Sequence, residues 1–315
     1  MAKIITVTAN TAIDFFIEVA GLAHDTVKAC HSAEFAGGKG VNVAKAVAAL
    51  GCPALCQGFV GGQSMAAFNA LATANLHTDF TVVAGKTRTN LTLSNTVTHQ
   101  QTHIITQGFS VTDADCRQLA NSFAATLSAG DSVIFSGSLP PGAPDNWYAT
   151  LIGLCHRKGA LPFLDSSGQG LKEGVKAKPY LIKPNQSEFE QIMGSVLATE
   201  QAIVAAARQL LALGIAWVCV SRGEQGLVLV GKHLALSARC NTLPITPLNT
   251  VGCGDALLAG LVVAIKQGGV VEDWARLAVA CGTANLSVAE PGRFDLGLVQ
   301  EIYKTVEIVR LAVWQ

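Results

Sequence analysis

A short segment, Val251–Asp255, combines two glycines with a carboxylate at the predicted start of a helix. It reads Val-Gly-Cys-Gly-Asp, and an apolar run rich in Ala and Leu follows directly. The first N–H groups of a helix have no partner within it, and the helix dipole there favours negative charge. Gly252 and Gly254 let this backbone approach a ligand closely. The segment therefore predicts a cradle for a phosphate and for the charge that develops in phosphoryl transfer.

Asp255 lies in the first turn of that predicted helix, where two interpretations are open. As a general base, it would accept the proton of an attacking hydroxyl. As a structural residue, it would only cap the helix while the glycines make the turn. Because such tetrapeptides are common by chance, a lone Gly-x-Gly-Asp favours the second interpretation. The other motifs of the chain favour the first.

A second glycine cluster, Gly37-Gly38-Lys39-Gly40, opens an alanine-rich segment that Gly51 closes. It predicts another anion-binding helix start, with a cation in the cluster and Asn42 in the first turn. The alternative is a glycine turn with a solvated lysine, but three glycines in four residues are unfavourable unless the backbone needs them. The spacing fits neither a P-loop nor a dinucleotide fingerprint.

Three further polar sites have two interpretations each. Asp14 follows the predicted strand Ile4–Thr8 and would either hold a sugar hydroxyl or stabilise a turn. Arg88 would fork onto a phosphate or lie at the surface. Asn185 and Glu188 have the spacing of a capping box, and Glu188 near a nucleotide would also order the waters around Mg²⁺.

The elements that position these residues alternate between strand and helix, most clearly from about Thr112 onward, as in a parallel sheet with crossover helices. Helices are predicted over 65–74, 113–127, 147–157, 201–213 and 273–289, and the last predicted core strand is 227–230. In a doubly wound sheet, the loops after the strands converge on one edge. This brings together Asp14, Lys39, Ser138, Asn185, Ser221 and Asp255.

Composition narrows the class of protein. The chain has 315 residues, 50% of them hydrophobic and 14% charged, which is typical of a globular protein. A net charge of zero argues against binding to nucleic acid or to a membrane surface. The nine dispersed cysteines indicate reduced thiols, and the N-terminal residues lack a signal-peptide core, so we expect a cytoplasmic protein.

These motifs together resemble those of the ribokinase-like (PfkB) carbohydrate kinases. The resemblance rests on the two glycine segments and on Ser136–Gly142, Lys183–Glu188 and Ser221–Gly226, which stand in family order along nearly the whole chain. It implies a three-layer α/β/α fold with a doubly wound, mostly parallel sheet. A single domain, 1–315, would carry a small β-sheet lid formed by about 13–36 and 86–107. In many relatives, this lid also pairs two subunits, so the resemblance implies a homodimer.

Within the family, the chain looks most like the 1-phosphofructokinase and tagatose-6-phosphate kinase branch. Three features carry this likeness: the segment Thr8–Asp14, the lysine within Gly37–Gly40, and Thr87–Asn90. Lys39 and Arg88 are the cations that indicate a substrate already carrying a phosphate. Relatives that bind unphosphorylated sugars have less use for them.

The resemblance also implies a role for each residue. Asp255 would be the base, and Gly252, Cys253 and Gly254 would supply N–H groups. The substrate would be held by Asp14, Gly38, Lys39, Asn42, Arg88, Ser138 and Lys28. ATP would be held by Lys183, Asn185, Ser221, Gly223, Gly226 and Asn285. Asn185 and Glu188 would serve Mg²⁺, with Glu188 acting through water.

The chain departs from the family pattern at four positions. Thr11 stands where proline is common, and Asn249 replaces the usual Asp or Ser. Cys253 replaces Ala, which places a thiol beside the catalytic Asp but keeps the N–H. His103 stands where relatives often carry an acidic residue or an arginine.

The resulting prediction is an ATP- and Mg²⁺-dependent kinase of a phosphorylated ketohexose, with fructose 1-phosphate as the leading substrate. Tagatose 6-phosphate is the nearest alternative, because both sugars present one phosphate and one primary hydroxyl. A kinase of unphosphorylated sugars or nucleosides is a more distant possibility, and a sugar-phosphate-binding regulator without catalytic activity is another.

Overall fold

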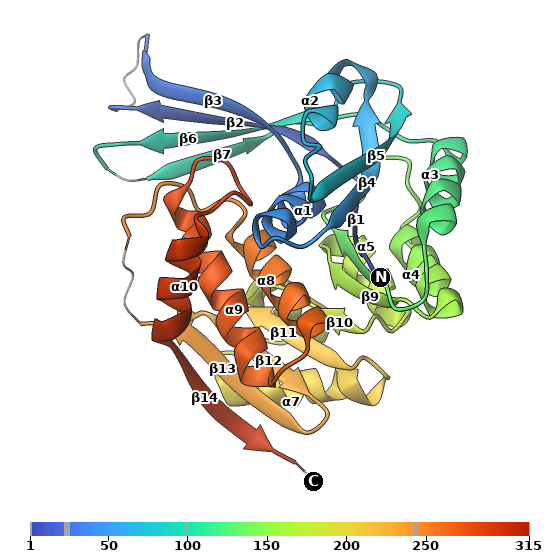
Figure 1. Ribbon diagram of the computed structural model, residues 1–315, viewed down its shortest axis with the longest axis vertical. Helices are drawn as coiled ribbons and strands as arrows, with labels where there is room; N and C mark the ends of the chain where they lie inside the picture. The colour runs from blue at the N-terminus through green and yellow to red at the C-terminus, as the bar shows by residue number, and fades with distance from the viewer. Residues whose placement is uncertain (1, 22–25, 99, 242–244, 315) are drawn as a thin grey trace.

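A ten-stranded sheet forms the centre of the computed structural model, which describes residues 2–21, 26–98, 100–241 and 245–314 (Figure 1). Pairing is parallel from β11 to β5 and antiparallel from β11 to β14. In spatial order the strands are β14 (Val306–Val313), β13 (Leu234–Cys240), β12 (Leu227–Gly231), β11 (Trp217–Ser221), β10 (Leu181–Ile182), β9 (Leu161–Asp165), β8 (Ser132–Ser136), β1 (Ile4–Thr8), β4 (Ala54–Gly61) and β5 (Leu76–Val83).

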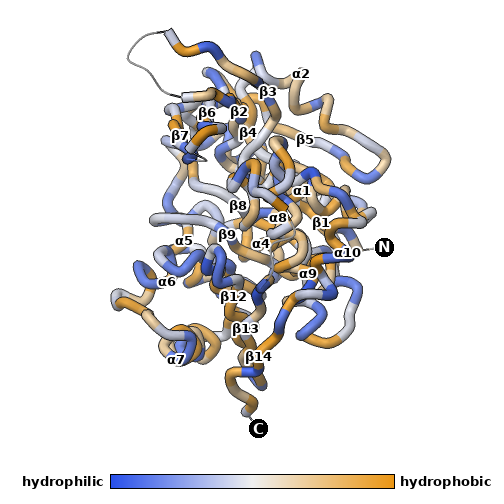
Figure 2. The backbone as a smooth tube through the Cα atoms, turned by 90° about the vertical axis from the view of Figure 1, so that its left-hand side faces the viewer, coloured by the Kyte–Doolittle hydropathy of each residue, from blue (hydrophilic) through white to orange (hydrophobic). Residues whose placement is uncertain are grey.

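Helices cover both faces of this sheet (Figures 1 and 2). Each face has its own hydrophobic core. One face carries α1 (Lys39–Ala49), α2 (Met65–Asn69), α8 (Cys253–Gln267), α9 (Val271–Ala284) and α10 (Leu296–Thr305). The other carries α3 (Asp113–Thr126), α4 (Trp147–Lys158), α5 (Gly168–Lys176), α6 (Gln186–Met193) and α7 (Glu200–Ala212). Single 3₁₀ turns lie at Gly62–Ser64, Gly223–Gln225 and Asn285–Ser287.

The central strands are apolar on both sides because both of their faces are covered. In β1, Ile4 packs into the core that holds α1 and α8, whereas Ile5 and Val7 pack into the core on the opposite face. All three are fully buried. This alternation fixes the register of β1 and therefore the position of the residues that follow its C-terminal end, which include Asp14.

A separate four-stranded sheet projects from this core (Figure 1). Its strands, in the order β3 (Ala29–Gly37), β2 (Ala12–Val19), β6 (Arg88–Asn95) and β7 (Gln101–Ile105), form what we call the small sheet. β2 and β6 pair in parallel, and the outer two pairs are antiparallel. Much of β3 and β7 is exposed, as expected for a sheet with one solvated side.

The predicted three-layer fold with a separate small sheet is confirmed, and several element predictions are corrected. Helix α2 ends at Asn69, not at residue 74. Helix α9 ends at Ala284, where a 3₁₀ turn replaces the last part of the predicted helix. The sequence-based prediction omitted α5, α10, β13 and β14. Within the described residues, no helix is long and apolar enough to cross a membrane.

Candidate active site

The glycine segment before α8 forms the predicted helix start, which we call the cradle. Gly252 is the N-cap and lies in the left-handed region, with φ 82° and ψ −4°. The helix begins with a bond from Ala256 N to Gly252 O, at 2.8 Å. A non-glycine residue at 252 would strain the backbone, and its Cβ would lie 2.5 Å from Cβ of Pro291. The turn therefore needs glycine, and the first N–H groups of α8 lie at the cleft wall described below.

Asp255, in the first turn of α8, is 5% exposed. Its Oδ2 accepts a hydrogen bond of 2.9 Å from Nδ2 of Asn42 on α1. Burial raises the pKa of Asp255 to about 6, although Lys39 and the Asn42 amide oppose the shift. A carboxylate with this pKa is largely ionised at neutral pH and is well matched to accept a proton from a hydroxyl.

A buried carboxylate that the sequence analysis gave no role, Asp165, lies beside this base. It ends β9 and is fully buried, and its Oδ1 lies 3.3 Å from Nζ of Lys39 and 3.4 Å from Nζ of Lys183. The charge of Asp165 raises the pKa of Lys39 and also contributes to the raised pKa of Asp255. Asp165 thus holds Lys39, from the glycine cluster before α1, next to Lys183, from the predicted ATP side.

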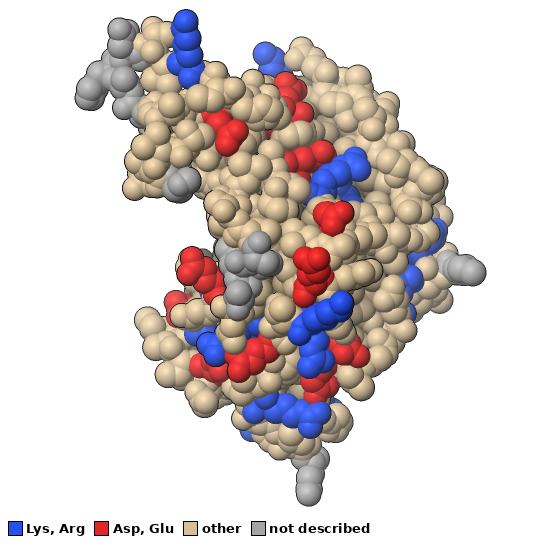
Figure 3. Space-filling view, turned by 60° about the vertical axis from the view of Figure 1, so that its left-hand side comes forward, with Lys and Arg blue, Asp and Glu red and all other residues tan. Residues whose placement is uncertain are grey.

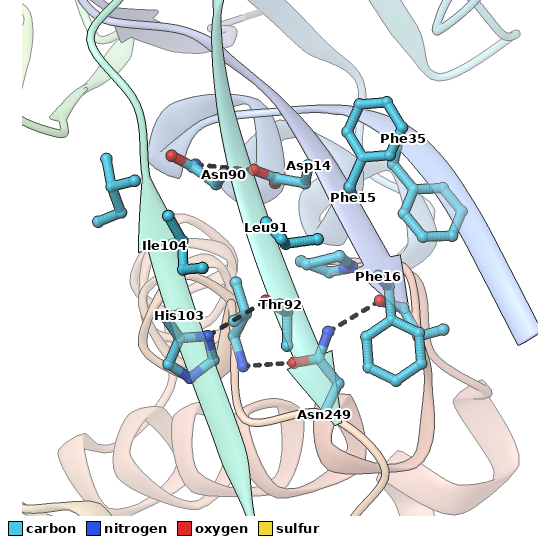
Figure 4. A pocket seen from close by; sticks show the side chains of 14 residues that line it. Asp14, Phe15, Phe16, Phe35, Asn90, Leu91, Thr92, His103, Ile104 and Asn249 are labelled. Atoms are coloured by element: carbon cyan, nitrogen blue, oxygen red, sulfur yellow. Dashed lines mark hydrogen bonds between the residues drawn. The ribbon is translucent and has the colours of Figure 1, made fainter. Parts of the chain in front are cut away.

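On the predicted sugar side, Asp14 and Asn90 come together from neighbouring strands of the small sheet. Nδ2 of Asn90 donates to Oδ1 of Asp14 at 2.8 Å (Figure 4), and burial raises the pKa of Asp14. A side chain at Gly37 would collide with the Asp14 carboxylate. Arg88, on the same strand as Asn90, donates from Nη2 to the backbone oxygen of Asn10 at 3.1 Å.

On the predicted nucleotide side, Asn185 and Glu188 form the capping box of α6. Glu188 N donates to Asn185 Oδ1 at 2.8 Å, and Asn185 N donates to Glu188 Oε2 at 2.9 Å. This confirms the structural interpretation of the pair. Within the described part of the chain, no hydrogen bond occupies the second Glu188 oxygen, which could face a hydrated cation. Among the described residues, no cluster of three or more His, Cys, Asp or Glu could hold a metal ion.

A cleft of about 1170 Å³ joins the predicted sugar and nucleotide sides. Figure 3 shows the molecule hollowed on one side, below the small sheet. Leu257, Val279 and Leu286 give the cleft an apolar part, suited to the flat face of a base. Its wall includes the following predicted site residues: Asp14, Gly38, Lys39, Asn42, Arg88, Lys183, Asn185, Glu188, Ser221, Gly223, Gly226, Gly252, Cys253, Gly254 and Asp255.

Three predicted site residues do not line this cleft. Lys28 is exposed just before β3. Ser138 accepts a 3.3 Å hydrogen bond from Nδ2 of Asn10, the residue whose carbonyl holds Arg88. Asn285 is fully buried, and its amide nitrogen donates to Val251 O at 2.9 Å. The structure thus places Asn285 behind the cradle, and any contact of these three residues with ligands stays a prediction.

A smaller cavity of about 130 Å³ lies under the small sheet (Figure 4). Its lining includes His103, whose Nδ1 lies 3.2 Å from Oγ1 of Thr92 on the adjacent strand. Gln101, on the same strand as His103, donates from Nε2 to Leu248 O at 2.8 Å and accepts from Thr250 Oγ1 at 2.9 Å. The small sheet therefore contacts the segment that leads into the cradle.

Comparisons with known proteins agree with this geometry. The profile of the pfkB family carbohydrate kinases matches residues 2–293. A provisionally assigned phosphofructokinase of Staphylococcus aureus is 28% identical, with a TM-score of 0.82 over 99% of this chain and 100% of that one. A protein described as a possible 1-phosphofructokinase from Thermotoga maritima is 25% identical, with a TM-score of 0.88 over 98% and 100%.

A more distant structure shows how widely the fold is shared. Ribokinase of Arabidopsis thaliana, with ribose and ATP, is 21% identical, with a TM-score of 0.72 over 96% of this chain and 99% of that one. At this identity the likeness shows the fold alone, which is the ribokinase-like fold. From the family match over nearly its whole length, the chain belongs to the PfkB family of carbohydrate kinases.

Proposed function

We propose that this carbohydrate kinase transfers a phosphoryl group from ATP to a phosphorylated ketohexose, with fructose 1-phosphate as the leading substrate and fructose 1,6-bisphosphate as the product. The observation that carries the proposal is the pairing of a buried base, Asp255, with a glycine cradle at the start of one helix, in a cleft that also holds Lys39 and Arg88. The phosphofructokinase names of two structural neighbours support the substrate class.

Each side of the cleft has a part in this reaction. Asp255 accepts the proton of the substrate's free primary hydroxyl, whose oxygen attacks the γ-phosphorus while the bond to the β-phosphate oxygen breaks. The N–H groups of Gly252, Cys253 and Gly254 stabilise the charge on the transferring group. Asp14 and Asn42 bind sugar hydroxyls, and the site excludes water when the small sheet acts as a lid.

Lys39 and Arg88 have different phosphate partners in this proposal. Lys39 lies close enough to Asp255 and Asp165 for their charges to raise its pKa, so we assign it to the transferring phosphoryl as well as to the substrate phosphate. Arg88 lies at the start of β6, the strand that carries Asn90 beside Asp14, so we assign it to the phosphate already on the substrate. Lys28 is an additional candidate for that phosphate if the lid closes.

ATP and Mg²⁺ are the proposed nucleotide and metal. Lys183, Asn185, Ser221, Gly223 and Gly226 form the nucleotide side, and the free oxygen of Glu188 is a hard donor that suits hydrated Mg²⁺. When bound, the metal would neutralise charge on the β- and γ-phosphates. The residues present therefore fit the metal without forming a closed cage around it.

The test is ATP consumption with Mg²⁺ against fructose 1-phosphate, tagatose 6-phosphate, fructose 6-phosphate, fructose and ribose. Turnover confined to fructose 1-phosphate is the expected result, and Asp255→Asn serves as the inactive control. Turnover on tagatose 6-phosphate would move the assignment to a tagatose-6-phosphate kinase. Activity on ribose or fructose that survives Lys39→Ala and Arg88→Ala would overturn it, and binding without turnover would indicate a regulator.

We also propose a cytoplasmic homodimer that pairs through the small sheet. Ile104 on β7 is 50% exposed, and pairing of two small sheets would remove this apolar side chain from water. Sedimentation of the wild type and of Ile104→Lys tests the pairing. A wild-type monomer at micromolar concentration would contradict it.

A further inference from the structure

An ion pair between a fully buried lysine and a partly exposed glutamate lies outside the cleft, and the proposed mechanism does not use it. Lys45, on α1, has a side chain with no exposed surface, and its Nζ lies 3.0 Å from Oε1 of Glu290. Burial lowers the pKa of Lys45, and the charge of Glu290 opposes that shift. Burying an ammonium group costs desolvation free energy, so a role for this pair other than stabilising the fold is worth testing.

Glu290 belongs to the loop 289–292, which contacts the cradle at three points. The first contact runs through Asn249. Nδ2 of Asn249 donates to Ala289 O at 2.9 Å, and its Oδ1 accepts from Val251 N at 3.0 Å (Figure 4). One amide side chain therefore joins the loop to the residue directly before the cradle glycine.

The second contact runs through Asn285. Gly292 N donates to Asn285 Oδ1 at 2.7 Å, and Asn285 Nδ2 donates to Val251 O at 2.9 Å. The same Nδ2 lies 3.6 Å from Sγ of Cys253. Both polar groups of the Val251 backbone are thus held by asparagine side chains that are themselves held by the loop.

The third contact is steric. Pro291 lies next to Gly252, so that a Cβ at position 252 would be only 2.5 Å from the Cβ of Pro291. Gly292, with φ 80°, lies so close to the backbone oxygen of Asn42 that a side chain there would collide with it. The loop 289–292 is therefore packed between the first turn of α1 and the first turn of α8.

We infer that Lys45 is a positioning residue for phosphoryl transfer. By holding Glu290, it fixes the loop 289–292 against α1, and the loop fixes Val251 through Asn249 and Asn285. The N–H groups of Gly252, Cys253 and Gly254 then stay aimed at the place where charge develops, which electrostatic stabilisation of a transition state requires. This inference rests on the proposed function, because it assigns the cradle to the transferring group.

The test compares Lys45→Met and Glu290→Gln with the wild type under the assay that identifies the substrate. We expect kcat to fall about 10- to 100-fold, less than the roughly 10²–10³-fold lost when an oxyanion-hole donor is removed, because here the donors are only displaced; KM for ATP and for the sugar phosphate should change less than about threefold. Lys45→Arg should recover at least a third of the lost activity. A matched control is Arg293→Gln, because Arg293 is 47% exposed and bonds the same Glu290 oxygen at 3.4 Å.

A second readout does not depend on turnover. The complex of ADP, Mg²⁺ and aluminium fluoride mimics the transferring phosphoryl, so its calorimetric affinity should fall by about the same factor as kcat while ADP alone binds as to the wild type. Circular dichroism confirms that each variant is folded, and Glu290→Gln serves if Lys45→Met does not fold. Unchanged kcat in a folded Glu290→Gln variant would overturn the inference. A wild type without turnover would instead remove the proposed function.

Discussion

The N-termini of α1 and α8 both follow a glycine but carry side chains of opposite charge. This glycine has a positive φ in each case, 109° at Gly38 and 82° at Gly252, and both helix ends reach the same cleft. The first residue of α1 is a cation, Lys39, whereas the first turn of α8 carries the carboxylate Asp255. In the proposed reaction the start of α8 binds a negatively charged group next to the Asp255 carboxylate, so it needs the positive charge that Lys39 on α1 supplies.

The first turn of α8 also shows which electrostatic effect dominates the pKa of Asp255. A helix N-terminus favours a carboxylate by roughly 0.3–1 kcal/mol, which lowers its pKa. Burial acts in the opposite direction and raises the pKa of Asp255 to about 6. Burial and the charge of Asp165 together outweigh Lys39, the Asn42 amide and Lys183, which favour the charged form of Asp255. A helix start alone would therefore make a poorer base than this buried one.

The largest expected effect comes from removing the carboxylate at the start of α8 while leaving the start of α1 unchanged. Asp255→Asn should lower kcat about 10²- to 10⁴-fold at pH 7.5, because this is what general-base catalysis typically supplies. Steady-state kinetics with fructose 1-phosphate measures this. Activity within tenfold of the wild type would show that the carboxylate is only a cap.

The same substitution should stabilise the fold at neutral pH. Since the folded pKa of Asp255 is raised, the native state binds a proton more tightly than the unfolded chain, and stability falls as pH rises from about 4 to about 6. Asp255→Asn should therefore raise the free energy of unfolding by about 1–3 kcal/mol at pH 7.5 and by little at pH 4. Urea unfolding at both pH values checks the sign.

The next effect tests the geometry of the cradle. Gly252→Ala should lower kcat about 10- to 100-fold and cost roughly 1–3 kcal/mol of stability, since the residue must keep a positive φ and would meet Pro291. Gly268→Ala is the matched control: it sits at the other end of α8 with φ 83° and has open space around its Cβ position. Equal kinetic losses in both variants would contradict a specific role for Gly252.

A smaller effect is expected at the carboxylate between the two lysines. Asp165→Asn should lower kcat about tenfold because Lys39 and Lys183 lose their shared partner. It should also move the acid limb of kcat/KM to lower pH, because the charge of Asp165 helps raise the pKa of Asp255. A shift to higher pH would contradict this electrostatic account.

The smallest effect concerns the hydrogen bond that joins the two helix ends. In the wild type, kcat/KM should rise with pH through a midpoint near 6, where Asp255 loses its proton. The Asn42 amide stabilises the charged form, so Asn42→Ala should move this midpoint upward by a few tenths of a pH unit. A midpoint that stays the same or falls would show that the bond does not tune the base.

Much of the architecture followed from local pattern. The glycine clusters before apolar runs predicted both helix starts, and the alternation of strands and helices predicted a parallel sheet with helices on both faces. Such features depend on residues within about ten positions of each other, so they are readable without a structure. The missed hairpin partner β13 and the C-terminal β14 pair antiparallel at the sheet edge, where a short alternating run resembles many loops.

The family motifs, the candidate base and the two predicted anion-binding helix starts could all be found in the sequence. Their electrostatic setting depends on how the elements pack. Asp165 reaches Lys39 across 126 positions, Asn42 reaches Asp255 across 213, and Lys45 meets Glu290 although the two are remote in the chain. Burial and charge pairing at such separations arise only when the strands and helices pack, and these are the interactions that set the pKa of the base and hold its cradle.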